Sequence, residues 1–324
     1  MRFNLSYIQA HSKQLFHRLR WNGTIRCPHC GSIYIHPGST NHRCRSCHKI
    51  FSDTSGTIFH ATKLSPLKIL SAIYYLLESP RGISSYTLAK YISVSQPTAW
   101  RLLHIIRSHM HQTLEASGDI IIDEVYVGAN WHFIPKYRKV QAVKRLEVRK
   151  RQENPKWTAP LNPATWKRLN YQAASEDKMV VVGFRDIKKG KIELMHLDTF
   201  NQDSLLDLLK TRNKGIIRII TDESPVYDIV TDKDRMESNG LKVLYRSTCN
   251  HKKSQYKSED GYTSNPIENT FSQIRRKWHG INQWWTKKYC QFYMDEIAFR
   301  LNYRDLPIYE RILSLFCLIV PNMG

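Results

Sequence analysis

Two apolar runs in the second half of the chain each end in a pair of acidic residues. The run Ile120-Ile121-Ile122 ends in Asp123-Glu124, and the run from Ile216 to Thr221 ends in Asp222-Glu223. Runs of this kind are typical of strands buried on both faces of a sheet. Because neighbouring strands can bring their last residues to one edge, we expect Asp123 and Asp222 to meet there. Glu124 and Glu223 are expected in outer positions, since adjacent residues on a strand point to opposite faces.

The segments after Gly118 predict a mixed sheet with helices on its faces, so the predicted fold class is α/β. The early strands form a hairpin and the later ones alternate with helices. We expect five strands, at Asp119–Val127, Met179–Phe184, Ile192–Leu197, Ile216–Thr221 and Lys242–Tyr245. Helices are expected at Gln202–Thr211, Pro225–Val230, Pro266–Trp278 and Lys287–Asn302, with no regular element after them.

A third acid, Glu268, follows Asn265-Pro266-Ile267 at the start of a predicted helix that can lean over the same sheet edge. Three clustered carboxylates repel one another unless divalent cations neutralise them. Oxygen ligands suit Mg²⁺ or Mn²⁺, and two such ions about 4 Å apart support phosphoryl transfer. Taken singly, Asp123, Asp222 and Glu268 also fit loop or helix caps. Their occurrence together, twice at strand ends, favours the catalytic interpretation.

Two Cys-x-x-Cys pairs near the N-terminus predict a structural zinc site. Cys27 and Cys30 form the first pair, and Cys44 and Cys47 form the second after a spacer of 13 residues. Four thiolates in this pattern complete a tetrahedral zinc centre. Free thiols or a redox pair are the alternative, although redox motifs of this type occur singly. Several neighbouring residues could substitute as ligands or touch phosphate: His29, His42 and His48, and Arg26, Arg43, Arg45 and Lys49.

The region from Arg81 to His111 has the outline of a helix-turn-helix. Helices are predicted at Pro66–Glu78, at Ser84–Tyr91 and from Gln96 onward, with a serine-rich turn before the last. In such a motif the first residues of the second helix reach base edges, and here these are Gln96, Thr98 and Arg101. A plain helical hairpin with a capping loop is the alternative interpretation.

The formal net charge of +21 predicts an acidic partner: DNA, RNA or an anionic membrane surface. No apolar run approaches the roughly 20 residues of a spanning helix, and residues Met1 to Ala10 lack the apolar core of a signal peptide. We therefore expect a soluble, intracellular protein whose acidic partner is a nucleic acid and not a membrane.

A basic stretch from Trp131 to Tyr171 follows the first acidic pair. It holds eleven Lys and Arg residues and two acids, and it lacks a clear apolar period. We interpret it as a mobile or DNA-ordered insertion that binds phosphate. Its tryptophans could stack on splayed bases: Trp131, Trp157 and Trp166. The tryptophans after Glu268 fit packing better than DNA contact: Trp278, Trp284 and Trp285.

Four phrases that occur in order resemble DDE-type transposases of bacterial insertion sequences, in the branch with an N-terminal zinc ribbon. They are Asp123-Glu124-Val125-Tyr126-Val127-Gly128, Thr221-Asp222-Glu223, Thr263 to Phe271, and Tyr293 to Asn302. The resemblance covers almost the whole chain. It implies a ribonuclease-H-like catalytic domain that cuts transposon ends and joins them to target DNA.

Carried over by position, the resemblance makes Asp123 and Asp222 the first two Mg²⁺ ligands. Glu268 or Asn265 is the third, and the charge of the carboxylate favours Glu268. Where the branch often has a lysine, this chain has Arg275. We expect Arg275 or Lys277 to hold a phosphate, and His251, next to Asn250, to be a DNA or active-site contact.

Together with this resemblance, the sequence predicts a cytoplasmic, nucleoid-associated, metal-dependent DNA transposase that binds double-stranded DNA and acts as a homo-oligomer on the element's ends. A nuclease of the same fold that only hydrolyses, and a zinc-ribbon regulator without catalysis, are the alternatives. The expected organisation is an N-terminal helix and zinc ribbon over 1–60, a helix-turn-helix region over 61–115, the catalytic domain over 116–305 with its insertion at 131–171, and a tail over 306–324.

Overall fold

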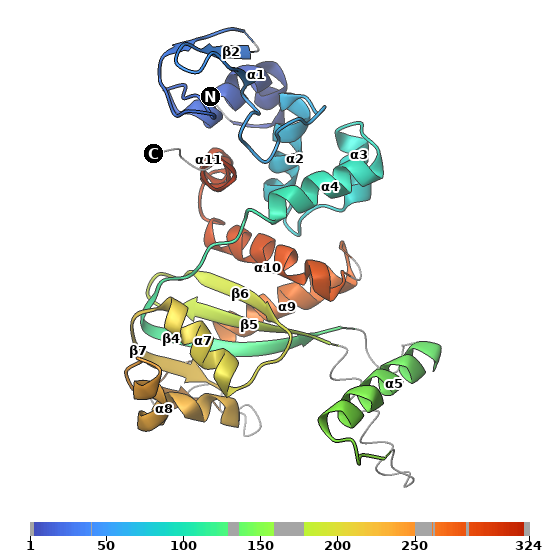
Figure 1. Ribbon diagram of the computed structural model, residues 1–324, viewed down its shortest axis with the longest axis vertical. Coiled ribbons are helices and arrows are strands. Elements are labelled where there is room, and N and C mark those ends of the chain that lie inside the picture. The colour runs from blue at the N-terminus through green and yellow to red at the C-terminus, as the bar shows by residue number, and fades with distance from the viewer. Residues whose placement is uncertain are drawn as a thin grey trace. The chain divides into compact units, whose positions relative to one another are not determined.

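The computed structural model describes residues 3–39, 41–128, 136–158, 178–249, 261, 263–282 and 285–320. The chain divides into two compact units, and each is described by itself (Figure 1). One combines Met1–Gln112 with Asp295–Gly324, and the other is Thr113–Met294. Among the described residues, no helix is both long enough and apolar enough to span a bilayer.

The first unit is helical. It contains α1 (Leu5–Trp21), α2 (Pro66–Glu78), α3 (Ser85–Tyr91), α4 (Gln96–Arg107), α11 (Ile308–Ile319) and the end of α10 (Lys287–Asn302). Helix α2 begins where the Ser65 side chain accepts a hydrogen bond from the Lys68 N–H and Pro66 occupies the first turn. Apolar faces from these helices meet in one core, which includes Phe16, Ile73 and Phe316.

The chain's last helical segments are tied to α2 by arginines. Arg300 donates to the Leu76 carbonyl at 3.2 Å and to the Ser79 carbonyl, and Arg311 donates to the Leu77 carbonyl at 3.4 Å. These carbonyls lie at the C-terminal end of a helix, where the last four have no partner inside the helix and cations are favoured. The guanidinium groups of Arg300 and Arg311 therefore cap α2 and hold the end of α10 and the start of α11 against it.

A small three-stranded antiparallel sheet also belongs to the first unit. Its strands are β1 (Ile35–His36), β2 (Asn41–Cys44) and β3 (Ile50–Ser52), in the order β1-β2-β3. Cys27, Cys44 and Phe51 are buried against Trp21 at the end of α1. The ribbon predicted around the cysteines is thus present.

The second unit is built on a mixed five-stranded sheet, as predicted. Its strands are β4 (Ala116–Val127), β5 (Met179–Asp186), β6 (Ile192–Leu197), β7 (Asn213–Thr221) and β8 (Tyr245–Thr248). They lie in the order β6-β5-β4-β7-β8. The pairs β4–β5 and β5–β6 are antiparallel, whereas β4–β7 and β7–β8 are parallel. A hairpin followed by strand–helix alternation therefore gives both kinds of pairing.

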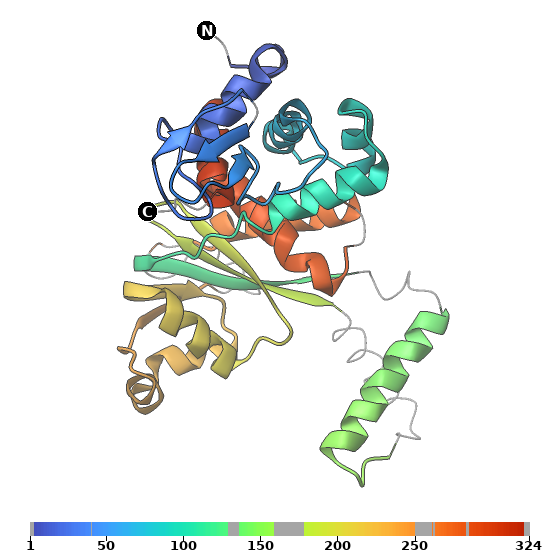
Figure 2. The ribbon, with the colours of Figure 1, turned by 45° about the horizontal axis from the view of Figure 1, so that its top comes forward.

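The two faces of this sheet are covered by different helices (Figures 1 and 2). Leucines of α7 (Gln202–Arg212) pack with Ile120, Ile122 and Phe184, together with residues of the 3₁₀ helix η2 (Pro225–Thr231) and of α8 (Lys233–Ser238). On the other face lies α9 (Asn265–His279). The alternation of side chains along β4 therefore sends Asp123 to the α9 face and Glu124 to the η2 face.

Gly183 lets α9 approach the sheet. This glycine is the partner of Asp123 in the β4–β5 ladder. A Cβ atom built on Gly183 would lie 2.7 Å from Cδ1 of Ile267 and 3.3 Å from Cε1 of Phe271. The lack of a side chain here makes room for the first turn of α9, and that turn carries Glu268.

Several sequence predictions of elements were wrong. Strand β8 is Tyr245–Thr248 and not Lys242–Tyr245. The N–H of Leu244 donates to the Val230 carbonyl, so pairing with β7 begins only at Tyr245. Helices α8 and α11 were missed. The predicted tail over 306–324 contains α11, and the buried side chains of this helix complete the core of the first unit.

The basic insertion also contains a helix that the sequence did not predict, α5 (Lys136–Glu153). Ala142, Val143 and Leu146 are buried and pack with Trp157. This apolar stripe follows a helical period, but it is short and surrounded by charge, so the periodicity is weak. The rest of the stretch, including Trp131 and Trp166, lies outside the described residues.

We predict that Gly183→Ala lowers the free energy of unfolding by about 1–3 kcal/mol, because the added methyl group overpacks the contact with Ile267. Ile267→Val removes the nearest atom, so the double variant should recover part of the loss. Urea denaturation of the wild type, both single variants and the double variant measures this coupling. Additive effects of the two changes would contradict a direct contact.

Candidate functional site

The four predicted zinc ligands lie together. The Sγ atoms of Cys27 and Cys47 are 3.6 Å apart, as are those of Cys30 and Cys44, and all four sulfurs lie within 4.8 Å of one another. Tetrahedral zinc with Zn–S bonds of about 2.3 Å places its sulfur ligands about 3.8 Å apart. The cluster therefore fits a single zinc ion.

Backbone hydrogen bonds favour the thiolate forms that zinc requires. The His29 N–H points to the Cys27 sulfur at 3.4 Å, and the Cys47 N–H points to the Cys44 sulfur at 3.5 Å. The hydrogen bond from Cys47 is the largest influence on Cys44, and together with its neighbours it lowers the pKa of that thiol to about 6. A thiol ionised at neutral pH binds the metal without a large cost for proton release.

His42, considered as a substitute zinc ligand, has another role. Its Nε2 atom lies 3.0 Å from Oδ1 of Asp53, and the same oxygen accepts a hydrogen bond of 2.7 Å from Nε1 of Trp21. His17 Nδ1 lies 3.1 Å from this oxygen. Asp53 thus links α1 to the ribbon. The Gly38 N–H points to Nδ1 of His42, so the proton of this ring is on Nε2, where it bonds Asp53.

The helix-turn-helix prediction places its three residues at the start of α4, with different surroundings. Gln96 donates to the Ser85 hydroxyl at 2.9 Å, and the Thr98 hydroxyl lies 2.8 Å from that of Ser95. Both polar groups are therefore engaged within the motif. Arg101 is exposed on α4, which leaves its side chain directed to solvent.

The ends of β4 and β7 bring Asp123 and Asp222 together. These parallel strands pair Ile121 with Ile220, and each acid stands two residues beyond this pair. Burial is the main reason that the pKa of Asp123 rises to about 7, and the carboxylates of Glu124, Asp222 and Glu268 raise it further. Asp222 and Glu268 therefore both lie within electrostatic range of Asp123.

Glu268 belongs to the first turn of α9. Its Oε1 atom accepts a hydrogen bond of 2.9 Å from the Ser264 hydroxyl. Asn265, the alternative third ligand, is exposed at the start of the same helix. Arg275 is exposed on α9, whereas Lys277 is buried. Of the two, the exposed Arg275 is the better placed to contact a DNA phosphate, and both contacts stay predictions.

Glu124 lies on the opposite face of the sheet from Asp123. Its Oε2 atom accepts a hydrogen bond of 2.6 Å from the hydroxyl of Tyr227, a residue of η2 that is fully buried. Burial raises the pKa of Glu124, and the nearby charge of Asp222 adds to this. Tyr227 was not found from the sequence, because a tyrosine within a short apolar helix has no pattern that distinguishes it from ordinary core.

Of the remaining residues that the sequence pointed to as possible DNA contacts, some are packed in the core and the others lie outside the described residues. Trp278 and Trp285 are buried, and Trp285 stacks on Tyr293 with ring centres 4.5 Å apart. Packing is therefore confirmed for both. Asn250, His251 and Trp284 lie outside the described residues.

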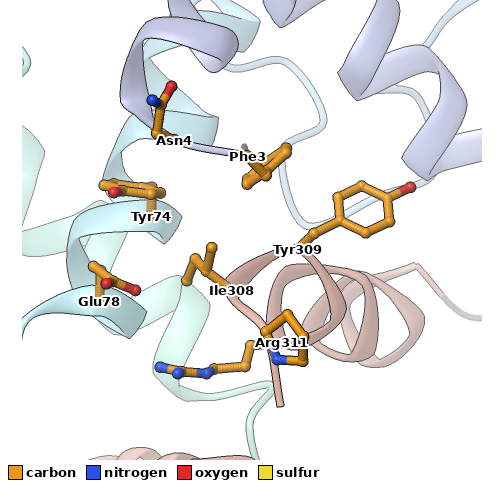
Figure 3. Close-up of a pocket in the computed structure, with 8 residues that line it drawn as sticks. Phe3, Asn4, Tyr74, Glu78, Ile308, Tyr309 and Arg311 are labelled. Carbon is orange, nitrogen blue, oxygen red and sulfur yellow. The ribbon is translucent and has the colours of Figure 1, made fainter. Parts of the chain in front are cut away.

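A cavity of about 480 Å³ lies in the first unit, between α2 and α11 (Figure 3). Phe3, Tyr74, Ile308 and Tyr309 give it a largely aromatic and aliphatic lining, with Glu78 and Arg311 at its polar side. None of the residues predicted to bind metal or DNA lines this cavity, so it adds nothing to the acidic site.

Comparisons with known proteins agree with the geometry. The family model described as the ISXO2-like transposase domain matches residues 115–302, which is more than half of the chain, and the transposase zinc-ribbon domain matches residues 9–50. A relative from Halobacterium salinarum, described as an uncharacterized protein in transposable element ISH50, is 24% identical over 232 residues. The alignment covers 70% of this chain and 71% of that protein.

We predict that the purified protein carries about one zinc per chain and that Cys44→Ser abolishes binding, because three thiolates and a hydroxyl hold zinc poorly. Cys317→Ser is the matched control, since Cys317 is an exposed thiol outside the cluster. Metal analysis by mass spectrometry gives the stoichiometry. Full zinc content in the Cys44 variant would contradict the assignment.

The raised pKa of Asp123 predicts a specific pH dependence of stability without divalent metal. Between its usual value of 3.8 and about 7, the folded protein keeps a proton that the unfolded chain releases, so stability falls as pH rises through this window. Asp123→Asn removes this loss. In buffer without added Mg²⁺ or Mn²⁺, and with the structural zinc retained, the Tm advantage of the variant should grow from pH 5 to pH 8.

The exposed residue Asp234 provides the control: Asp234→Asn should follow the wild type at every pH. A Tm difference between Asp123→Asn and the wild type that stays constant from pH 5 to pH 8 would show that Asp123 does not hold the proton.

Proposed function

The chain belongs to the family of ISXO2-like transposases, and we propose that it cuts the ends of a mobile DNA element and joins them to target DNA in a metal-dependent reaction. The observation that supports this proposal is that Asp123 and Asp222 stand two residues beyond a residue pair of β4 and β7, and that the charges of Asp222 and Glu268 both act on Asp123. The net charge of +21 supports a polyanionic substrate.

Asp123, Asp222 and Glu268 would hold Mg²⁺ or Mn²⁺. The fit is supported by the donor set, which consists of carboxylate oxygens. It is also supported by the pKa of Asp123, which burial raises most and the charges of Glu124, Asp222 and Glu268 raise further, because a divalent cation would relieve that repulsion. Bound cations would supply Lewis-acid polarisation of the phosphate and stabilise the charge on the attacking and leaving oxygens. Asn265 can offer a carbonyl oxygen but no charge, so we assign Glu268 as the third ligand.

The reaction has two displacements at phosphorus. In the first, a water oxygen bonds to the phosphorus at the element's end, the bond to the 3′ oxygen breaks, and a 3′-hydroxyl and a 5′-phosphate are released. In the second, that 3′-hydroxyl oxygen attacks a target phosphodiester in line and displaces the target's own 3′ oxygen. The three carboxylates would hold the cations that bind the phosphate in position for both steps, and no covalent bond between protein and DNA is required.

Basic side chains on both units support DNA binding. In the ribbon, Arg26, Arg43, Arg45 and Lys49 are all exposed. On the helices, Arg101 and Arg275 are exposed as well. We assign the ribbon and the helix-turn-helix to the element's ends, and Arg275 to a phosphate near the acids. Because two ends are joined to one target, the active form is a homo-oligomer on DNA.

We predict that Asp123→Asn, Asp222→Asn and Glu268→Gln each reduce cleavage and strand transfer by at least about 100-fold, because each removes one charged ligand. Binding to element ends should stay within about threefold of the wild type. An assay with labelled end DNA and a supercoiled target separates cut ends from joined products.

The same assay distinguishes the alternatives. Cut ends without joined products in the wild type would indicate a nuclease. Wild-type activity in the Asp123 and Asp222 variants would leave the acids without a catalytic role. If Asn265→Ala is as inactive as Glu268→Gln, both residues are needed at the third position.

A further inference from the structure

Asp222 lies on a turn that follows β7 and is outside the paired part of the sheet. The last pair between β7 and β8 joins Thr221 to Thr248, and the Cys249 N–H donates to the Thr221 carbonyl at 3.0 Å. Asp222 and the residues up to Ser224 lie beyond this ladder. The direction of the Asp222 carboxylate therefore depends on contacts other than strand pairing.

Arg246 on β8 provides these contacts. Its Nε atom donates to the Thr221 hydroxyl at 3.0 Å, and its Nη2 atom donates to the carbonyls of Asp222 at 2.9 Å and Ser224 at 3.0 Å. Its Nη1 atom donates to the carboxylate of Asp228 in η2. The side chain of Arg246 is 11% exposed. One guanidinium group thus joins the end of β7, the turn and η2.

The contacts of Arg246 stop at the backbone of Asp222. The Asp222 carboxylate has a separate support: its Oδ1 atom accepts a hydrogen bond of 2.9 Å from the Ser224 N–H, which is an Asx turn. Because Arg246 also holds the Ser224 carbonyl, it fixes both ends of this small turn. The guanidinium therefore orients the Asp222 carboxylate without forming the ion pair that would compete with a metal.

Only arginine has enough hydrogen-bond donors in a fixed geometry to make all four of these contacts. Three different groups of the guanidinium point in fixed directions within one plane, whereas the single ammonium of lysine is a point charge on a flexible stem. The acceptors of Arg246 lie on separate segments, so a lysine at this position would satisfy only some of them. Half-buried carbonyls of Asp222 and Ser224 without a donor would then loosen the turn.

We propose that Arg246 is a positioning residue that fixes the Asp222 turn so that the carboxylate is preorganised to bind a divalent cation. This inference rests on the proposed function, since it assumes that Asp222 is a metal ligand. It adds a residue that neither the acidic motifs nor the match to the transposase family assigns. Residues that orient a metal ligand typically change metal affinity by about 10–100-fold when they are altered.

The test is a Mn²⁺ titration of the zinc-loaded, full-length protein, followed by electron paramagnetic resonance of free Mn²⁺. We expect Arg246→Met to weaken Mn²⁺ binding by at least about tenfold, and Arg246→Lys to weaken it by less. Asp123→Asn defines the signal that belongs to the acidic site. Far-UV circular dichroism and thermal melting establish that each variant is folded.

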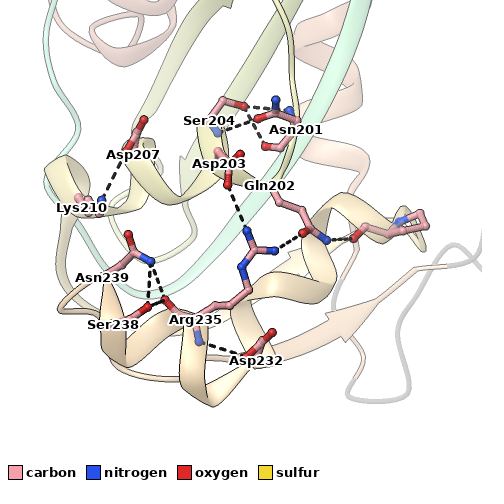
Figure 4. Close-up of polar contacts among 11 residues, drawn as sticks. Asn201, Gln202, Asp203, Ser204, Asp207, Lys210, Asp232, Arg235, Ser238 and Asn239 are labelled. Carbon is pink, nitrogen blue, oxygen red and sulfur yellow. Dashed lines mark hydrogen bonds and ion pairs between the residues drawn. The ribbon is translucent and has the colours of Figure 1, made fainter.

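Arg235 offers a matched control (Figure 4). It also forms a fork, with Nη1 donating to Gln202 at 2.6 Å and Nη2 donating to Asp203 at 3.1 Å. Both partners lie on α7, and neither belongs to the turn that carries Asp222. Arg235→Met should bind Mn²⁺ as the wild type does, which separates the loss of any arginine fork from the loss of this one.

Asp228→Asn tests the same inference if Arg246→Met does not fold. It leaves the guanidinium in place and removes only the charge of its fourth partner, so a loss of a few-fold in Mn²⁺ affinity is expected. Wild-type affinity in folded Arg246→Met, or in both Arg246→Lys and Asp228→Asn, would overturn the proposal while leaving the proposed function intact. If the wild type itself binds no Mn²⁺ at the acids, the proposed function fails and this inference fails with it.

Discussion

The parallel pairing of β4 with β7 is the constraint on which the site depends. It places two like charges, Asp123 and Asp222, side by side at the ends of buried strands. Burial is the main cause of the raised pKa of Asp123, and the nearby charges of Glu124, Asp222 and Glu268 raise it further. Each of the three carboxylates accepts a hydrogen bond that stabilises it. The donors are the backbone N–H of Ser224 for Asp222, the hydroxyl of Ser264 for Glu268, and the backbone N–H of Glu124 for Asp123. Under the proposed function, a divalent cation bound here would relieve the repulsion among these carboxylates.

Each face of the sheet contributes a different part of the site. The α9 face supplies Glu268, and Gly183 allows the helix to seat next to Asp123. The opposite face supplies the buried Tyr227, which holds Glu124, and Asp228, which orients Arg246. Asp222 lies at the strand end between these two sets. The sheet therefore acts as a rigid frame, while short turns and a helix start aim the carboxylates, which agrees with the general need to hold catalytic groups on well-packed elements.

Much of this arrangement was predictable because it follows from patterns that are local in sequence. The apolar runs before Asp123 and Asp222 predicted buried strands, the two Cys-x-x-Cys pairs predicted the metal cluster, and Ser65-Pro66 predicted the start of α2. What could not be predicted depends on contacts between distant segments. Arg246 and Asp228 are unremarkable in the sequence, and only the fold brings them to the Asp222 turn. The stripe of α5 is too short to stand out among eight basic residues, and α11 is explained by the core that it completes.

Diffraction from crystals grown with Mn²⁺, recorded at the manganese absorption edge, tests most directly whether the acidic cluster is a metal site. The structure predicts an anomalous peak within coordination distance of both Asp123 and Asp222, with Glu268 nearby, and that this peak disappears in Asp123→Asn. Anomalous density confined to the four-cysteine cluster, with the Asp123 and Asp222 side chains turned away from one another, would contradict a metal-dependent function for this site.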